Sequence, residues 1–166
     1  MMMLSRINGR GRRRNTARSQ GSAISTSGLT KIGDMTAQGG LAAAFDGTTS
    51  QAGASSAGKS TSPGYVGVTF TAPTRVFAFD TYGGNNTGYD SSGNPSLTLD
   101  IYGKAGSAPA NSTDGTLLAT QTFTDTAVTD QRAFVSTDNE TLYDHVWVRV
   151  STSAPRVAEL VIYESV

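Results

Sequence analysis

The chain has 166 residues, with 13 basic and 13 acidic side chains, one histidine and no cysteine. This length suits a single folded domain, and the absence of cysteine excludes disulfide bonds and thiolate chemistry. Six of the basic residues are arginines within the first twenty positions, so the remainder has 7 basic against 13 acidic side chains. The neutral total therefore conceals a basic arm and an acidic body.

The N-terminal segment, residues 1–27, is predicted to be an extended basic arm that does not fold by itself. Its short apolar start precedes the charges, which is the wrong order for a secretory signal, and no stretch reaches the length of a membrane-spanning helix, so no membrane insertion is expected. We expect the arm to dock onto neighbouring protein subunits, mainly through residues 10–14. Nucleic-acid binding is the alternative, but no aromatic residue is interleaved for base stacking. The docking residues are Arg6, Arg10, Arg12, Arg13, Arg14 and Arg18.

The body, residues 28–166, is predicted to be all-β. Its first apolar patch, Leu41–Phe45, is predicted to be a helical turn or a short strand. Seven later runs alternate in polarity with a period of two residues and are separated by turn residues, which is typical of strands. Seven such runs without a good helix indicate a β-sandwich. The runs are residues 65–70, 75–80, 97–102, 117–123, 132–135, 143–151 and 157–163.

Alternation also predicts which side chains face the core. In the run 97–102, three aliphatic side chains share one face and are expected to be buried. The run 143–151 carries large side chains on both faces, which indicates a central strand. The long loops at 82–95 and 103–115 are the expected ligand-binding positions, because loops on a rigid scaffold often carry binding residues. The predicted core residues of the first run are Leu97, Leu99 and Ile101.

No catalytic constellation is visible in the sequence. His145 is the only histidine, and it lies within a strand pattern, where a structural role is expected. The acidic residues are scattered singly, and neither a phosphate-binding loop nor a metalloprotease helix is present. A non-enzymatic protein is therefore expected.

Five segments of the body occur in a characteristic order. They are AAAFDGTT at 42–49, GYVGVTFTAPTRV at 64–76, LTLDIYGKAG at 97–106, HVWVRVS at 145–151 and AELVIYE at 158–164. Together they resemble the discoidin-like, galactose-binding-like family over about residues 40–164. The resemblance implies a jelly-roll β-sandwich that displays ligand loops at one end and often holds a structural calcium ion.

The resemblance implies Asp46 and Glu159 as the calcium ligands, since they match the acidic residues of the A-F-D-G and A-E-L segments. Calcium needs several oxygen ligands, which backbone carbonyls nearby would have to complete. The alternative is that Asp46 caps the following turn through its own backbone, as Asp before Gly often does. One departure from the family is that residues 50–62 hold mostly small side chains and no tryptophan, where a tryptophan is usual.

Carbohydrate binding is the commonest use of this family, and the loop 82–95 has suitable side chains. Two tyrosines there are expected to stack on a sugar ring, while amide and carboxylate groups bind its hydroxyls. The alternative is that the Gly and Asn residues of this loop only serve turns. The candidate glycan ligands are Tyr82, Asn85, Asn86, Tyr89 and Asp90.

An anchoring arm joined to a jelly-roll body resembles small structural proteins of tailed bacteriophages and related particles. The leading hypothesis is thus a virion component, forming homo-oligomers, whose arm docks into other virion proteins and whose body contacts such proteins or host polysaccharide. This step rests on analogy, because fold does not imply function. The alternatives are a carbohydrate-binding module and a coat protein whose arm binds nucleic acid.

Overall fold

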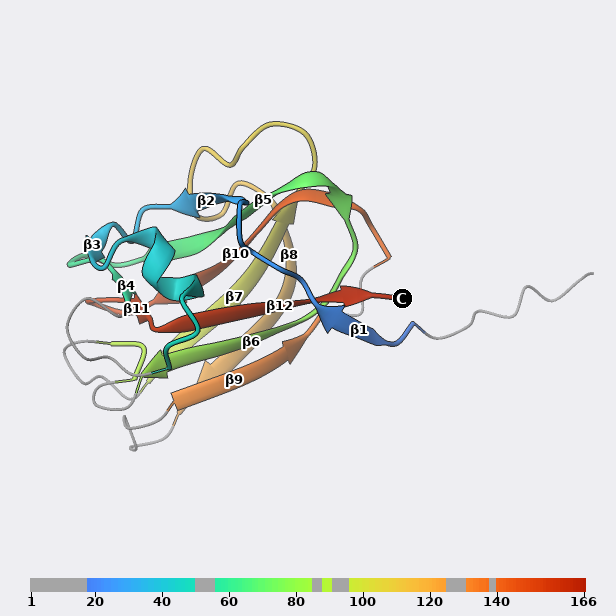
Figure 1. The fold of residues 1–166 in the computed structure, drawn as a ribbon. Helices are drawn as coiled ribbons and strands as arrows, with labels where there is room; N and C mark the ends of the chain where they lie inside the picture. The colour runs from blue at the N-terminus through green and yellow to red at the C-terminus, as the bar shows by residue number, and fades with distance from the viewer. Residues whose placement is uncertain (1–17, 50–55, 85–87, 91–95, 125–130, 138–139) are drawn as a thin grey trace, which may run out of the picture.

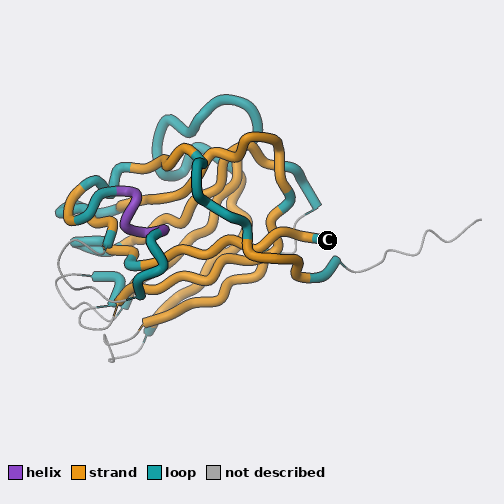
Figure 2. The backbone as a smooth tube through the Cα atoms, in the orientation of Figure 1, coloured by secondary structure: helices purple, strands orange, loops and turns teal. Residues whose placement is uncertain are grey.

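The chain folds into two packed β-sheets that enclose one core (Figure 1). The computed structural model describes residues 18–49, 56–84, 88–90, 96–124, 131–137 and 140–166. Strands make up most of this part of the chain, and a short 3₁₀ helix, η1 (Leu41–Phe45), lies at one side (Figure 2). The strands are β1 (Gln20–Ala23), β2 (Thr30–Gly33), β3 (Ala37–Gln38), β4 (Ala57–Gly58), β5 (Gly64–Thr74), β6 (Val76–Gly84), β7 (Leu97–Lys104), β8 (Thr116–Phe123), β9 (Gln131–Ser136), β10 (Tyr143–Ser151), β11 (Arg156–Val157) and β12 (Glu159–Ser165).

The strand order confirms the predicted all-β jelly-roll sandwich. One sheet has four strands in the order β1-β12-β6-β9, and the other has five in the order β2-β5-β10-β7-β8. A small third sheet, β11-β4-β3, lies near one end of the sandwich. Neighbouring strands pair antiparallel throughout these sheets. Each of the seven predicted runs falls on strands between β5 and β12. Of the helical turn and the short strand predicted for Leu41–Phe45, the structure has the helical turn.

The sequence does not reveal the first two strands, β1 and β2. Residues 20–27 are assigned to the arm by composition, yet Gln20–Ala23 form β1 and pair with the last residues of β12 (Gln20 with Ser165 and Ala23 with Tyr163). Both β1 (QGSA) and β2 (TKIG) are four residues long and hold mostly small or polar side chains, so no alternation of polar and apolar residues marks them. Their backbone groups find partners only because β12 and β5 pass beside them.

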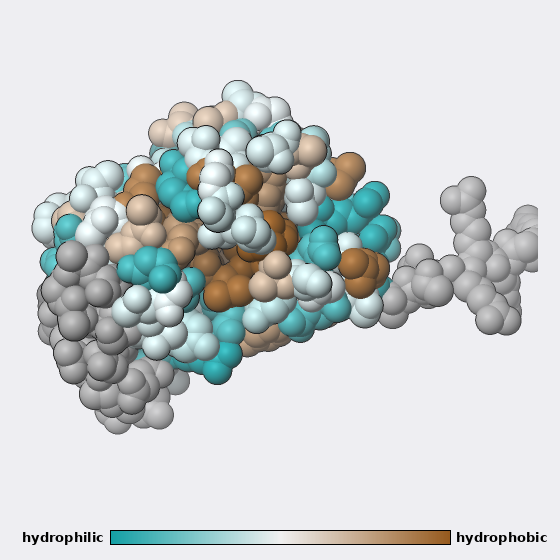
Figure 3. All heavy atoms as spheres, in the orientation of Figure 1, coloured by the Kyte–Doolittle hydropathy of each residue, from teal (hydrophilic) through white to brown (hydrophobic). Residues whose placement is uncertain are grey.

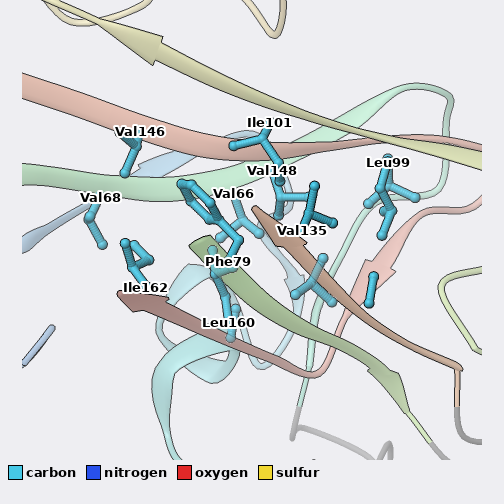
Figure 4. Close-up of a cluster of buried hydrophobic side chains, with 14 of the residues drawn as sticks. Val66, Val68, Phe79, Leu99, Ile101, Val135, Val146, Val148, Leu160 and Ile162 are labelled. Atoms are coloured by element: carbon cyan, nitrogen blue, oxygen red, sulfur yellow. The ribbon is translucent and has the colours of Figure 1, made fainter. Parts of the chain in front are cut away.

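The core lies between the two sheets (Figure 4). Aliphatic residues at alternate positions of both sheets point toward one another, and the predicted core residues Leu97, Leu99 and Ile101 are among them, with exposures of 4%, 0% and 0%. Burying a side chain of this kind contributes about 1.5–3 kcal/mol. The labelled members of the cluster are Val66, Val68, Phe79, Leu99, Ile101, Val135, Val146, Val148, Leu160 and Ile162.

Strand β10 is central, as its two-sided pattern predicts. It pairs with β5 on one side and β7 on the other, which places Trp147 between Gly67 and Tyr102. Gly67 permits this close approach, since a Cβ atom there would lie 2.0 Å from the carbonyl oxygen of Val146. Trp147 is fully buried although it lies on the outer side of its sheet.

Candidate functional site

Two of the five predicted glycan ligands are buried, which corrects their assignment. Tyr89 is 0% exposed, and its hydroxyl donates to the Thr81 carbonyl oxygen at 2.7 Å. Its ring packs 5.4 Å from the ring of Phe123, and burial raises the pKa of its hydroxyl. A side chain enclosed in this way cannot stack on a sugar, so Tyr89 belongs to the core.

Asp90 is also 0% exposed. Its Oδ2 atom accepts hydrogen bonds from the hydroxyls of Thr152 and Ser153. Because buried carboxylates must be hydrogen-bonded, these contacts are what allows Asp90 to lie inside the fold. Asn85 and Asn86 lie outside the described residues, and Tyr82 is the remaining candidate whose side chain reaches solvent.

The second predicted binding loop, 103–115, is packed against the five-stranded sheet. The Trp147 indole N–H donates to the carbonyl oxygen of Ser112 at 2.9 Å, and His145 Nε2 donates to the carbonyl oxygen of Gly106 at 2.8 Å. Asp114 holds the same loop by accepting from Lys104 Nζ at 2.7 Å. This loop therefore covers part of the sheet, and His145 has the structural contacts expected of it.

A group of aromatic and polar side chains lies on the outer side of the four-stranded sheet. Tyr82 of β6 pairs directly with Arg132 of β9, whose guanidinium lies 4.8 Å from the centre of the tyrosine ring. Phe134 is 48% exposed, and its ring lies 5.8 Å from that of Tyr163 on β12. We call this patch the outer aromatic face; it consists of Asp80, Tyr82, Arg132, Phe134 and Tyr163.

An ion pair holds the polar part of the outer aromatic face in place. Arg132 donates from Nε and Nη2 to the two carboxylate oxygens of Asp80, at 2.8 and 2.6 Å. The Asp80 side chain is 5% exposed, whereas that of Arg132 is 54% exposed. The buried carboxylate thus fixes an exposed guanidinium, and hydrogen bonding to Asp80 raises the pKa of Arg132. This two-bond geometry gives the group a defined direction.

A cavity of about 540 Å³ opens elsewhere, between η1, β12 and the segment that joins β1 to β2. Figure 3 shows hydrophobic residues gathered in the middle of this side of the molecule. The apolar lining includes Ile24, Phe45 and Leu160, and the ammonium of Lys31 lies 4.8 Å from the centre of the Phe45 ring. Asp46 and Glu159, the predicted calcium ligands, line the same cavity.

The structure brings Asp46 and Glu159 together through the turn that follows η1. Glu159 Oε2 accepts the backbone N–H of Gly47 at 2.9 Å, and Asp46 Oδ1 accepts that of Thr48 at 2.8 Å. The second bond is the turn cap expected of an Asp before Gly. Burial, and then the nearby Asp46 charge, raise the pKa of Glu159 to about 7, although the Gly47 N–H opposes the shift.

The carboxylates of Asp46 and Glu159 fit a calcium site only in part. Both carboxylates accept N–H bonds from the turn, so backbone donors compete with any cation for these oxygens. Within the described ranges, no three His, Cys, Asp or Glu side chains group in a way that could hold a metal. Oxygen ligands beyond these two carboxylates would have to come from the backbone. Calcium therefore stays a prediction.

The predicted docking arginines lie almost wholly in residues 1–17, outside the described residues. Arg18 is described, and its Nε atom lies 3.5 Å from a carboxylate oxygen of Glu140. Its docking role is thus untested. None of the helices in the described part of the chain is long and apolar enough to cross a membrane.

Most of the outer aromatic face is not apparent from the sequence. Four of its residues lie within predicted strands, where nothing in the pattern distinguishes them from other strand residues. They are Asp80, Arg132, Phe134 and Tyr163. A usable signal is the alternation in β9, where Gln131, Ala133 and Val135 are buried and the intervening residues are exposed. This alternation places Arg132 and Phe134 together on the outward face of the strand.

No protein-family model and no curated protein matches the sequence. Among solved structures, the chain is similar to the fucolectin from striped bass (Morone saxatilis) serum, with a TM-score of 0.66, 16% identity and coverage of 88% of this chain and 48% of that one. It thus spans about half the length of the fucolectin. It is also similar to the F5/8 type C domain of a Bacteroides fragilis protein, with a TM-score of 0.59, 13% identity and coverage of 90% and 97%.

A third similar structure contains the CBM32-1 and CBM32-2 domains of Clostridium perfringens ZmpB in complex with GalNAc. Its TM-score is 0.59, with 13% identity and coverage of 86% of this chain and 34% of that one. Identities this low establish the fold alone. The chain has the discoidin-like jelly-roll fold of these lectin, F5/8 type C and CBM32 domains.

Proposed function

We propose that the body of this chain is a carbohydrate-binding domain and that the outer aromatic face is its binding surface. The observation that carries the proposal is the exposed Phe134 ring beside Tyr163, on the same sheet face as the Tyr82, Arg132 and Asp80 group. The likeness to a lectin and to a domain solved with GalNAc supports the choice of ligand class. The proposal assigns the chain a binding role and no catalytic step.

The chemistry of the outer aromatic face suits a sugar. A pyranose ring has a face of C–H groups that packs against an aromatic ring, and hydroxyls at its edge that exchange hydrogen bonds. Phe134 offers the apolar surface, while Arg132 has N–H groups beyond the two that bind Asp80. These side chains project from a rigid sheet, so little conformational entropy is lost when a ligand binds.

Replacing Phe134 by alanine should weaken carbohydrate binding about tenfold or more. A glycan array and affinity electrophoresis in polysaccharide gels, both with the full chain, measure this directly. Loss of the exposed ring removes stacking worth about 0.5–1.5 kcal/mol together with its contact area. Leu117→Ala is the matched control, because Leu117 is 52% exposed on β8 of the other sheet. Undiminished binding by Phe134→Ala would place the site away from this face, and a wild-type protein that binds no glycan would overturn the proposed function.

The virion hypothesis and its nucleic-acid alternative rest on arm residues outside the described part of the chain, and both stay predictions. Co-purification with assembled particles tests the first. Retention on nucleic acid at low salt, lost when residues 1–17 are deleted, tests the second, because such binding is electrostatic. The carbohydrate proposal is independent of both, since its residues lie on β6, β9 and β12.

A further inference from the structure

We infer that strand β8 is an interaction edge, and that two copies of this chain associate by pairing their β8 strands antiparallel. The five-stranded sheets of the two copies then form one continuous sheet about a two-fold axis. This inference goes beyond the proposed function and does not depend on it, because the outer aromatic face lies on the other sheet. Three features of β8 carry it: its composition, its exposure and the symmetry of its sequence.

The first feature is that β8 lacks the protection that the other edge strands have. Strands β2 and β8 are the edges of the five-stranded sheet, and β1 and β9 are those of the four-stranded sheet. Proteins protect such edges with short strands, prolines or charged residues, because an unpaired edge can hydrogen-bond to another chain. β1 and β2 are four residues long, and β2 and β9 hold Lys31 and Arg132. In contrast, β8 (TLLATQTF) is eight residues long and contains neither a charged residue nor a proline.

The second feature is the exposure of β8. None of its residues is buried, although most of its partner strand β7 is. Gln121 is exposed even though it pairs with Leu99, whose side chain is in the core. Within the described ranges, β8 pairs with β7 and with no strand on its other side. The outer backbone edge of β8 is therefore available to a further strand.

The third feature is that β8 is complementary to itself. Its register with β7 is regular over residues 119–123, and Gln121 is the middle of this segment. A two-fold axis at Gln121 places Thr120 of one copy opposite Thr122 of the other, and Gln121 opposite its own equivalent. Threonine pairs stabilise antiparallel strands when they lie directly opposite each other. The same short segment can thus supply both sides of the interface.

Charge also favours a second copy as the occupant of this edge. Apart from the six arginines of residues 1–20, each chain has 13 acidic against 7 basic side chains, so most surfaces of two copies repel one another. No charges oppose each other where β8 meets β8. Asp100 on the neighbouring strand is paired with Arg149 at 2.8 Å and accepts the Thr120 hydroxyl at 2.9 Å. The β8 edge therefore lets two acidic bodies meet without bringing unpaired carboxylates together.

Sedimentation velocity of the full chain at a series of protein concentrations tests the association. The wild type should pass from monomer to dimer as the concentration rises. Gln121→Lys places two ammonium groups opposite each other at the axis, so it should raise the dissociation constant of the dimer about tenfold or more. Thr30→Lys is the matched control, because it adds the same charge at an exposed position of β2, the opposite edge of the same sheet, and should leave the constant unchanged. Circular dichroism checks that both variants fold.

A disulfide cross-link tests the register. The chain has no cysteine, so a single one introduced at position 121 can form a disulfide only with its equivalent in a second copy. Oxidation of Gln121→Cys with diamide should give a cross-linked dimer in high yield, because residues that face each other at the axis lie within disulfide distance. Thr122→Cys is also exposed but lies opposite Thr120, so it should cross-link far less.

Three results would overturn the inference. The first is a wild type that stays monomeric at every concentration. The second is a dimer whose dissociation constant is unchanged in Gln121→Lys, because another surface would then hold it together. The third is cross-linking of Thr122→Cys as efficient as that of Gln121→Cys, because the strands would then not pair about Gln121. The proposed carbohydrate binding is tested separately, on the glycan array.

Discussion

Replacing Trp147 by alanine should lower the free energy of unfolding by about 3–5 kcal/mol, the usual cost of removing a fully buried large aromatic side chain. Trp147 is 0% exposed and lies between two tyrosines, parallel to Tyr102 at 5.6 Å and edge-on to Tyr65 at 6.2 Å. The loop 103–115 packs on the indole, since a Cβ atom on Gly115 would lie 2.6 Å from Trp147 Cη2. The substitution thus leaves a cavity between Tyr65, Tyr102 and the loop 103–115, and it removes the hydrogen bond that holds this loop to the sheet.

Urea unfolding followed by circular dichroism measures this effect, because Trp147 is the only tryptophan and its fluorescence disappears with it. Trp147→Phe keeps an aromatic ring but loses the bond to Ser112, so its loss should be clearly smaller than that of Trp147→Ala. Leu117→Ala is the exposed control and should change stability by less than about 0.5 kcal/mol. A loss below about 1 kcal/mol in Trp147→Ala would mean that the loop collapses into the space.

The second large effect is a fall in stability as the pH rises from about 4.5 to 7. The pKa of Glu159 is raised from its ordinary value of 4.5 to about 7, chiefly by burial. Between these values the folded state holds a proton that the unfolded state has released, so the free energy of unfolding decreases with increasing pH. The contribution is present in full below pH 4.5 and is lost above pH 7. Its size is about 1–3 kcal/mol.

Glu159→Gln isolates this contribution. The glutamine retains an oxygen for the Gly47 N–H but does not titrate, so the difference in stability between wild type and variant should change across this pH range and be constant outside it. Urea titrations at several pH values in the presence of a chelator give the difference. A difference that is flat from pH 4.5 to 7 contradicts the raised pKa.

Calcium binding would lower the pKa of Glu159, whereas burial raises it. A cation held by Asp46 and Glu159 favours the ionised carboxylates, so excess calcium should raise the melting temperature of wild type at pH 7.5 and remove its pH dependence. Glu159→Gln should respond less. If calcium produces neither a heat of binding nor a shift in melting temperature, the calcium prediction is wrong. The two carboxylates then serve only to accept the N–H groups of Gly47 and Thr48.

Most of the strands could be predicted because their pattern is local. In β7, Leu97, Leu99 and Ile101 alternate with more polar residues, and that alternation alone determines which of them face the same way. The position of β10 at the centre of its sheet was visible in the same manner, from large side chains on both of its faces. The short β1 and β2 could not be recognised, since their hydrogen-bond partners lie far away in the sequence.

The site was harder to predict than the fold. Tyr82, Tyr89 and Asp90 lie close together in a polar segment, and their composition gives no means of telling which side chains turn inward. The fold buries Tyr89 against Phe123 and Asp90 against Thr152, while Tyr82 remains at the surface. Residues of β9 and β12 complete the outer aromatic face from positions about 50 and 80 residues further along the chain.

The sequence by itself determined the division into a basic segment and an acidic body, the all-β class and the inward faces of the long strands. Each of these follows from composition or from a period of two residues, which are properties of neighbouring positions. Only the tertiary structure decided which outward side chains stay exposed, that the loop 103–115 covers Trp147, and that Phe134 and Tyr163 meet beside Arg132. The physical reason is that exposure and juxtaposition depend on which distant segment passes over or beside a strand, and that is decided by packing of the whole chain.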